Sequence, residues 1–167
     1  TYKELDELVD QVAIWLDYKG VKQGGVVSVV VKNCIEYFPI YLGTIRVGGI
    51  INPFPATLSQ FDLLKNLRYT EPDVVVCHDT HSSYMKSHGF DVYELNFRND
   101  TQFFDDISIK DTTSVTADSV LDANAPACLY YSSGTTDDPK GIIYSHANMM
   151  SLIGSIVRGF GHKDSDQ

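Results

Sequence analysis

The chain has 167 residues, enough for one domain of ordinary size. Apolar residues make up 43% and charged residues 21%, a composition that supports a buried core and excludes disorder of the whole chain. The 13 basic and 22 acidic residues give a formal charge of -9, which repels nucleic-acid phosphates, so we expect no nucleic-acid partner. No apolar run approaches the roughly 20 residues of a transmembrane helix, and no secretion signal is evident.

The three cysteines, Cys34, Cys77 and Cys128, form no CxxC pair and lie in apolar stretches. Thiols of this kind are typical of proteins that stay in a reducing compartment. We therefore expect packed, reduced cysteines and a cytoplasmic protein.

The N-terminal segment is predicted to form a helix that ends at Gly20. Thr1 and Glu4 have the spacing of a capping box. Apolar residues recur along one face of this helix, at Leu5, Leu8, Val9, Val12, Ala13 and Leu16.

Strands and helices are then expected to alternate. Short apolar runs, rich in β-branched residues, predict strands at 26–31, 50–54, 74–78 and 92–95. Because the central runs are apolar on both faces, they indicate a parallel sheet covered by helices on two sides. The predicted fold class is therefore α/β.

Three helices should connect these strands. One is predicted to begin at a capping box formed by Asn33 and Glu36, to bend at Pro39 and to stop at Gly48. The second should be capped by Ser59 and Asp62, and a short third helix is expected at 82–87. We place three residues on the buried side of the second helix: Phe61, Leu64 and Leu67.

A polar stretch at 98–124 lacks apolar periodicity and indicates a surface connection. We accordingly expect an α/β lobe at 1–110, a connecting segment at 111–125 and the start of a second lobe at 126–167. The last part should contain strands at 128–132 and 142–145, followed by a helix that begins at His146.

The segment between the last two strands carries the clearest chemical signal. It offers hydroxyl groups, flexible glycines and one lysine, which together suit a polyphosphate ligand. It is not a Walker A loop, because Gly141 follows Lys140 and a strand comes next. The alternative is an ordinary hairpin turn with its tip at 137–139. The candidate ligand-binding residues are Ser132, Ser133, Gly134, Thr135, Thr136 and Lys140.

Other candidate sites are weaker. Cys77, His78, His81 and His88 lie close in sequence but have no metal-ligand spacing, so we predict no metal site. His146 follows a strand and is best explained as a helix-start residue rather than a base, and no catalytic residue is predicted.

The segment from Tyr131 to Gly141 resembles the phosphate-binding loop of the adenylate-forming, or AMP-binding, superfamily, which includes acyl-CoA synthetases, peptide-synthetase adenylation domains and luciferases. The matching residues are Tyr131, Ser132, Ser133, Gly134, Thr135, Thr136, Pro139, Lys140 and Gly141. The stretches 1–5, 43–53 and 145–148 resemble further motifs of the same family, in the same order.

The resemblance implies the N-terminal part of an acyl-CoA synthetase-like ligase of fatty acid metabolism, with the first lobe of the family's N-terminal domain. Such an enzyme activates a carboxylic acid with ATP and Mg²⁺ as an acyl-adenylate and then transfers the acyl group to coenzyme A. By the same resemblance, Lys140 would offset charge on the departing pyrophosphate. The β- and γ-phosphates would be held by the hydroxyl groups of Ser132, Ser133, Thr135 and Thr136.

Two features depart from the family pattern. Asp137 stands where the family has glycine, and its carboxylate would face phosphate oxygens. The chain also lacks the family's later motifs, so we expect it to be inactive alone and to dimerise through exposed apolar surface. The rival hypothesis is a non-catalytic α/β module, partner-binding or vestigial, with a decayed phosphate loop.

Overall fold

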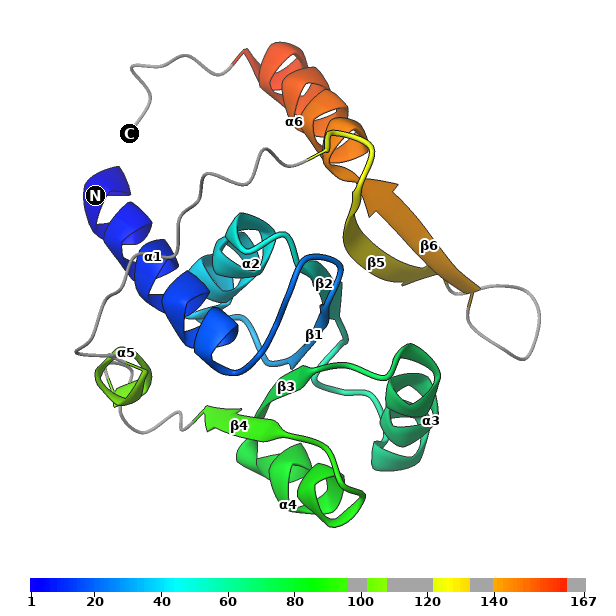
Figure 1. Ribbon diagram of the computed structural model, residues 1–167. Coiled ribbons are helices and arrows are strands. Elements are labelled where there is room, and N and C mark those ends of the chain that lie inside the picture. Colours follow the sequence, from blue (N-terminus) through cyan, green and yellow to red (C-terminus); the bar gives the residue numbers. More distant parts are fainter. Residues whose placement is uncertain (96–101, 108–121, 133–139, 162–167) are drawn as a thin grey trace.

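The structure, a computed structural model, describes residues 1–95, 102–107, 122–132 and 140–161. Helices and strands alternate through most of it (Figure 1). In chain order they are α1 (Tyr2–Tyr18), β1 (Val26–Val30), α2 (Tyr37–Arg46), β2 (Ile50–Pro53), α3 (Gln60–Thr70), β3 (Val74–His78), α4 (Asp79–Ser87), β4 (Val92–Leu95), α5 (Gln102–Asp106), β5 (Pro126–Ser132), β6 (Lys140–Ser145) and α6 (His146–Phe160).

The strands form one sheet in the order β4-β3-β1-β2-β5-β6. Every neighbouring pair is parallel except β5 and β6, which form an antiparallel hairpin at the edge. At the centre, Val27 of β1 lies opposite Ile51 of β2 on one side and Val74 of β3 on the other. The predicted α/β fold with a mostly parallel sheet is confirmed.

Helices cover both faces of the sheet (Figure 1). On one face, Trp15, Leu16 and Ile40 from α1 and α2 pack against Val27 and Val29 of β1. On the other face, Leu63, Leu64, Leu67 and Met85 from α3 and α4 pack against Val30, Val75 and Cys77. Burial on both faces explains why the central strands are continuous apolar runs.

Two of the three predicted N-terminal helix caps are confirmed, and the third is wrong. The Thr1 and Glu4 capping box is present, and the Ser59 hydroxyl accepts a hydrogen bond from the Asp62 N–H. The capping box at Asn33 is wrong, because α2 begins at Tyr37 after Glu36, which makes no side-chain cap. Pro39 lies in the first turn of α2, where a missing N–H costs no helical hydrogen bond.

Three expectations about burial and helix boundaries also fail. Phe61 is 73% exposed, because the inward stripe of α3 runs through Leu63, Leu64 and Leu67. Helix α4 begins at Asp79 rather than at residue 82. In the polar stretch 98–124, α5 buries Phe103 against Trp15, with ring centroids 6.1 Å apart.

The C-terminal hairpin continues the same sheet, with β5 parallel to β2. The Ser145 hydroxyl caps α6, but no residue of α6 is buried. Its exposed apolar side chains are Met150, Leu152, Ile153, Ile156, Val157 and Phe160. The lobe boundary at 111–125 stays a prediction, since most of that segment lies outside the described residues.

In the part of the chain that the structure describes, no helix is long and apolar enough to cross a bilayer.

We predict that Gly43→Ala destabilises the protein, because α1 and α2 touch at this glycine. A Cβ at Gly43 would lie 2.7 Å from Cγ1 of Val12, closer than packed atoms tolerate. Overpacking of this kind costs about 1–3 kcal/mol of unfolding free energy. The matched control is Gly159→Ala in α6, where an added Cβ meets nothing within 4 Å and should stabilise the helix. Chemical denaturation measures both changes, and equal stability of the Gly43 variant and wild type would contradict the packing argument.

Candidate functional site

The two strands of the β5–β6 hairpin frame the predicted phosphate-binding loop. Tyr131 lies opposite Gly141, and the backbone of Ser132 pairs with that of Lys140. Asp137 lies outside the described residues. The same holds for four of the candidate residues, Ser133, Gly134, Thr135 and Thr136. The Lys140 side chain is exposed, and no carboxylate in the described part of the chain pairs with it.

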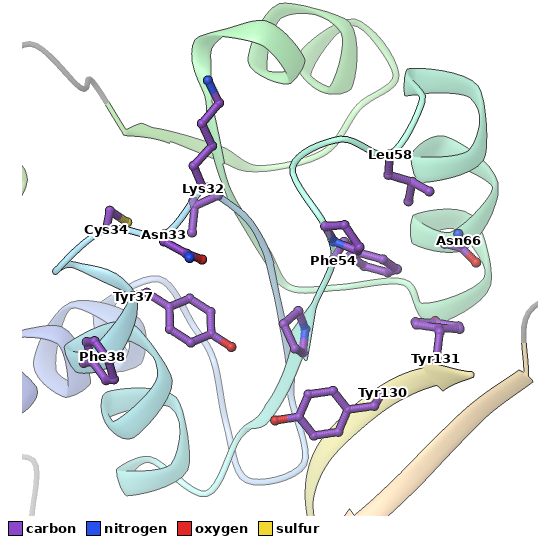
Figure 2. Close-up of a pocket in the computed structure, with 13 residues that line it drawn as sticks. Lys32, Asn33, Cys34, Tyr37, Phe38, Phe54, Leu58, Asn66, Tyr130 and Tyr131 are labelled. Atoms are coloured by element: carbon purple, nitrogen blue, oxygen red, sulfur yellow. The ribbon is translucent and has the colours of Figure 1, made fainter. Parts of the chain in front are cut away.

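A pocket of about 900 Å³ lies next to this hairpin, beyond the carboxyl ends of β1 and β2 (Figure 2). Its walls are mostly aromatic and apolar. They are formed by Val31, Lys32, Asn33, Cys34, Tyr37, Phe38, Pro53, Phe54, Pro55, Leu58, Asn66, Tyr130 and Tyr131. Tyr130 and Tyr131 directly precede Ser132, so the pocket and the loop share strand β5.

The polar side chains that line the pocket carry amides, phenols, one thiol and the amine of Lys32. Burial raises the pKa of Tyr37 to about 12 and that of Cys34 to about 11, so both groups are neutral at physiological pH. Among the described residues, none that line the pocket is acidic, although the chain as a whole carries a charge of -9. The pocket wall therefore does not add to the repulsion that an anion meets elsewhere on the surface.

His78 holds one wall of the pocket in place. The Lys32 N–H donates to Nε2 of His78 at 2.9 Å, and Nδ1 lies 3.4 Å from the Leu95 carbonyl oxygen. Nε2 must be unprotonated to accept this bond, which places the proton of the neutral ring on Nδ1. His78 thus links the loop after β1 to the ends of β3 and β4.

Side chains fix β5 from both faces of the sheet. On one face, the Tyr41 hydroxyl lies 2.8 Å from Cys128 Sγ and 3.0 Å from the Tyr130 hydroxyl. On the other, Tyr131 stacks on Phe54, with ring centroids 5.2 Å apart and planes inclined by 24°. Burial and the hydrogen bond to Cys128 raise the pKa of Tyr41.

The remaining candidates have structural partners. His81 Nε2 lies 3.2 Å from the Ala56 carbonyl oxygen, and His88 is exposed beside Tyr84. Burial raises the pKa of Cys77 to about 12, which disfavours the thiolate that binds metals. Among the described residues, no group of three metal-ligating side chains converges. His146 is the first residue of α6, as predicted.

The pocket itself was not predicted from the sequence. Its residues come from the segments that follow β1 and β2, and from β5. A signal existed, because ligands of parallel α/β sheets bind beyond the carboxyl ends of the strands. Lys32 and Asn33 follow the predicted strand 26–31, and Pro55 follows the predicted strand 50–54.

A family model described as "AMP-binding enzyme" matches residues 1–167. Surfactin synthase subunit 3 of Bacillus subtilis (strain 168) is 31% identical over 154 residues, which cover 92% of this chain and 12% of that protein. Peroxisomal OPC-8:0-CoA ligase 1 of Arabidopsis thaliana is 26% identical, and the match covers 100% of this chain and 32% of that ligase. The chain thus spans less than a third of either protein.

Solved structures share the fold. The crystal structure of ATP-bound MatB from Rhodopseudomonas palustris superposes with a TM-score of 0.78 and 25% identity. The superposition covers 94% of this chain and 32% of that one. The α/β arrangement is therefore that of part of a larger known fold.

We predict that acid weakens the protein through His78. Burial, the largest influence, lowers the pKa of His78 below its ordinary value of 6.5, and charge on Lys32 also lowers it, whereas Leu95, Asp79 and Glu36 act in the opposite direction. As the pH falls through about 6.5, His78 therefore takes up a proton in the unfolded chain before it does so in the folded protein. The unfolding free energy is highest above this pH and decreases below it.

The test compares melting temperatures at pH 7.5 and pH 5 for wild type, His78→Gln and His88→Gln. Glutamine offers an acceptor near the position of Nε2 but does not titrate. The His78 variant should lose less stability on acidification than wild type, whereas the exposed His88 control should follow wild type. An unchanged pH dependence in His78→Gln would refute this assignment.

Proposed function

Because the chain belongs to the AMP-binding enzyme family, whose members are adenylate-forming ligases, we propose that it supplies the phosphate-binding hairpin of such a ligase. The enzyme would join ATP to a carboxylic acid. The observation that carries this proposal is the family match over the whole chain, in which a described hairpin pairs Ser132 with Lys140 at the two ends of the loop.

The proposed reaction has two steps. A carboxylate oxygen attacks the α-phosphorus of ATP, the bond to the bridging oxygen breaks, and pyrophosphate leaves. A thiol, which we propose to be that of coenzyme A, then displaces AMP from the acyl-adenylate and gives a thioester. No residue of this chain forms a covalent bond in either step, so its contribution would be positioning and electrostatics.

We assign the phosphate contacts to the loop. The Gly134 N–H and four hydroxyl groups would donate hydrogen bonds to the β- and γ-phosphates. The hydroxyl groups are those of Ser132, Ser133, Thr135 and Thr136. Lys140 would offset the charge that grows on the leaving pyrophosphate. Mg²⁺ commonly binds through substrate phosphates, and the described residues offer no cluster for it, so no step is assigned to it on this chain.

The carboxylic acid and the thiol acceptor would be selected by a complete enzyme. The matched ligase and the MatB structure are each about three times as long as this chain. We propose an acyl-CoA synthetase of fatty acid metabolism rather than a peptide synthetase, although the relatives include both kinds. Free thiols at Cys34, Cys77 and Cys128 fit the proposed cytoplasmic location. The chain alone is proposed to be incomplete as a catalyst.

We predict that Lys140→Gln weakens ATP binding about tenfold, the effect expected when one charge-assisted hydrogen bond is lost. Calorimetric titration of MgATP into the protein measures the dissociation constant. The control, Lys3→Gln, removes the same charge from the exposed surface of α1. Measurements at two salt concentrations separate the local effect of Lys140 from the change in net charge.

The outcomes distinguish the two functional hypotheses. Weaker ATP binding in the Lys140 variant alone supports the ligase proposal. Equal ATP binding by both variants and wild type would contradict the assigned role of Lys140. No measurable binding of ATP by a protein that contains the family's later motifs would favour the non-catalytic module.

We also propose that the isolated 167-residue chain pairs with a second copy through α6 and the outer strand β6. The apolar side chains of α6 are exposed along one helix, and Ile142 and Ile143 are exposed on the adjoining strand. Exposed apolar side chains of this kind favour association, because it removes them from water.

We predict that Ile153→Lys, at the middle of this face, shifts the chain toward monomer. The charged side chain would have to be desolvated in a dimer interface. Light scattering across a concentration series measures the mass. Tyr69→Lys is the matched control, because Tyr69 is 89% exposed on α3, away from the face. A wild-type chain that stays monomeric at every concentration would overturn this proposal.

A further inference from the structure

The hairpin that frames the loop has a weak backbone connection to the rest of the sheet. Strand β1 pairs with β2 from Val26 to Val29, whereas β5 pairs with β2 at one position, Ile51 with Cys128. Backbone hydrogen bonds therefore constrain the position of β5 less than that of the central strands. Side-chain contacts must supply the remaining constraint.

Tyr41 supplies a directional constraint. Its hydroxyl contacts both Cys128 Sγ and the Tyr130 hydroxyl, at 2.8 Å and 3.0 Å, so one side chain of α2 reaches two alternate residues of β5. Residues two apart on a strand share one face, so this pair of contacts defines where β5 lies along its own direction. A slip of β5 by one residue would break both contacts.

The contact on the opposite face is of a different kind. Phe54 and Tyr131 stack with nearly parallel rings, an arrangement that holds the strand against the sheet. Stacked rings tolerate lateral displacement better than hydrogen bonds do. Besides this stacking, Tyr131 has a side-chain hydrogen bond with Asn52. The hydroxyl of Tyr41, with partners at two positions of β5, therefore adds a directional constraint on the longitudinal position of the strand to the Ile51–Cys128 backbone pair.

We propose that Tyr41 is a positioning residue that fixes the two ends of the phosphate-binding loop. From Cys128 and Tyr130 the constraint passes along β5 to Ser132, and across the hairpin from Ser132 to Lys140. The relevance of this constraint to phosphate binding rests on the proposed function. The anchoring of the hairpin by the Tyr41 hydroxyl does not depend on that function.

Tyr41→Phe removes the hydroxyl and keeps the ring, so the packing of α2 is preserved. The matched control is Tyr93→Phe, which also loses one hydroxyl with a hydrogen-bond partner, Asp106 at 3.1 Å, but on β4 at the other edge of the sheet. Amide hydrogen exchange is followed in the hairpin and in the central strands of the complete 167-residue chain. The Tyr41 variant should exchange its hairpin amides at least about tenfold faster than wild type, with β1 and β3 unchanged.

The control should leave exchange in the hairpin at the wild-type rate. Equal exchange of the hairpin in the Tyr41 variant and wild type would overturn the proposal. Equal acceleration of every strand would also overturn it, because Tyr41 would then contribute only to global stability.

A second measurement reports the functional part. The dissociation constant for MgATP should rise about fivefold in Tyr41→Phe, the loss expected for one hydrogen bond's contribution, at a temperature where all variants are folded. Cys128→Ala should have a similar effect, whereas Cys128→Ser, which keeps a hydrogen-bonding group, should restore most of the affinity. The Tyr41→Phe and Cys128→Ala effects should not add in the double variant, because both remove the same contact.

Hydrogen exchange and ATP affinity test separate parts of the proposal. Additive effects on ATP affinity, or no effect of Tyr41→Phe on it, would overturn the positioning role. The affinities are therefore measured in a protein that contains the family's later motifs. If its wild type binds no ATP, the proposed function fails, and hydrogen exchange still decides whether Tyr41 anchors the hairpin.

Discussion

The hairpin joins the parallel sheet at one register pair, Ile51 of β2 with Cys128 of β5, and the candidate site depends on this junction. Tyr130 and Tyr131, which follow Cys128, form part of the pocket wall and lead directly to Ser132. The aromatic pocket and the loop are therefore not independent features. A displacement of β5 would change the shape of the pocket and the separation of the loop from the central strands together.

The fold was largely predictable because its strongest signals are local. The run 74–77 is apolar throughout, which indicates burial on both faces, and the Thr1 and Glu4 spacing identifies the start of α1 without tertiary information. Errors arose where tertiary contacts decide. Phe103 sits in a polar stretch with no periodic pattern and is buried because Trp15 lies beside it.

The phosphate-binding role of the loop stays a prediction from its chemistry, and the pocket beside it was not predicted. Hydroxyl groups, glycines and Lys140 in one short segment indicate an anion site from composition alone. The pocket is assembled from three segments separated by up to about a hundred positions, so no local pattern contains it. Likewise, nothing in the sequence near Tyr41 indicates a bond to Cys128, because that contact exists only once β5 lies beside β2.

A protein with a net negative charge can bind a polyphosphate only where local groups offset the repulsion by its distant carboxylates. The described residues near the candidate loop have three features that reduce this repulsion. Acidic side chains are absent from the pocket wall, the phenols and the thiol in it are neutral, and Lys140 has no carboxylate partner among the residues described. Because Coulomb interactions between exposed charges fade beyond about 10 Å at moderate salt, the groups nearest a bound phosphate outweigh the distant excess of negative charge. Local geometry therefore matters more than net charge, and a strand that fixes the position of Lys140 would also fix the field at the phosphates of the proposed ligand.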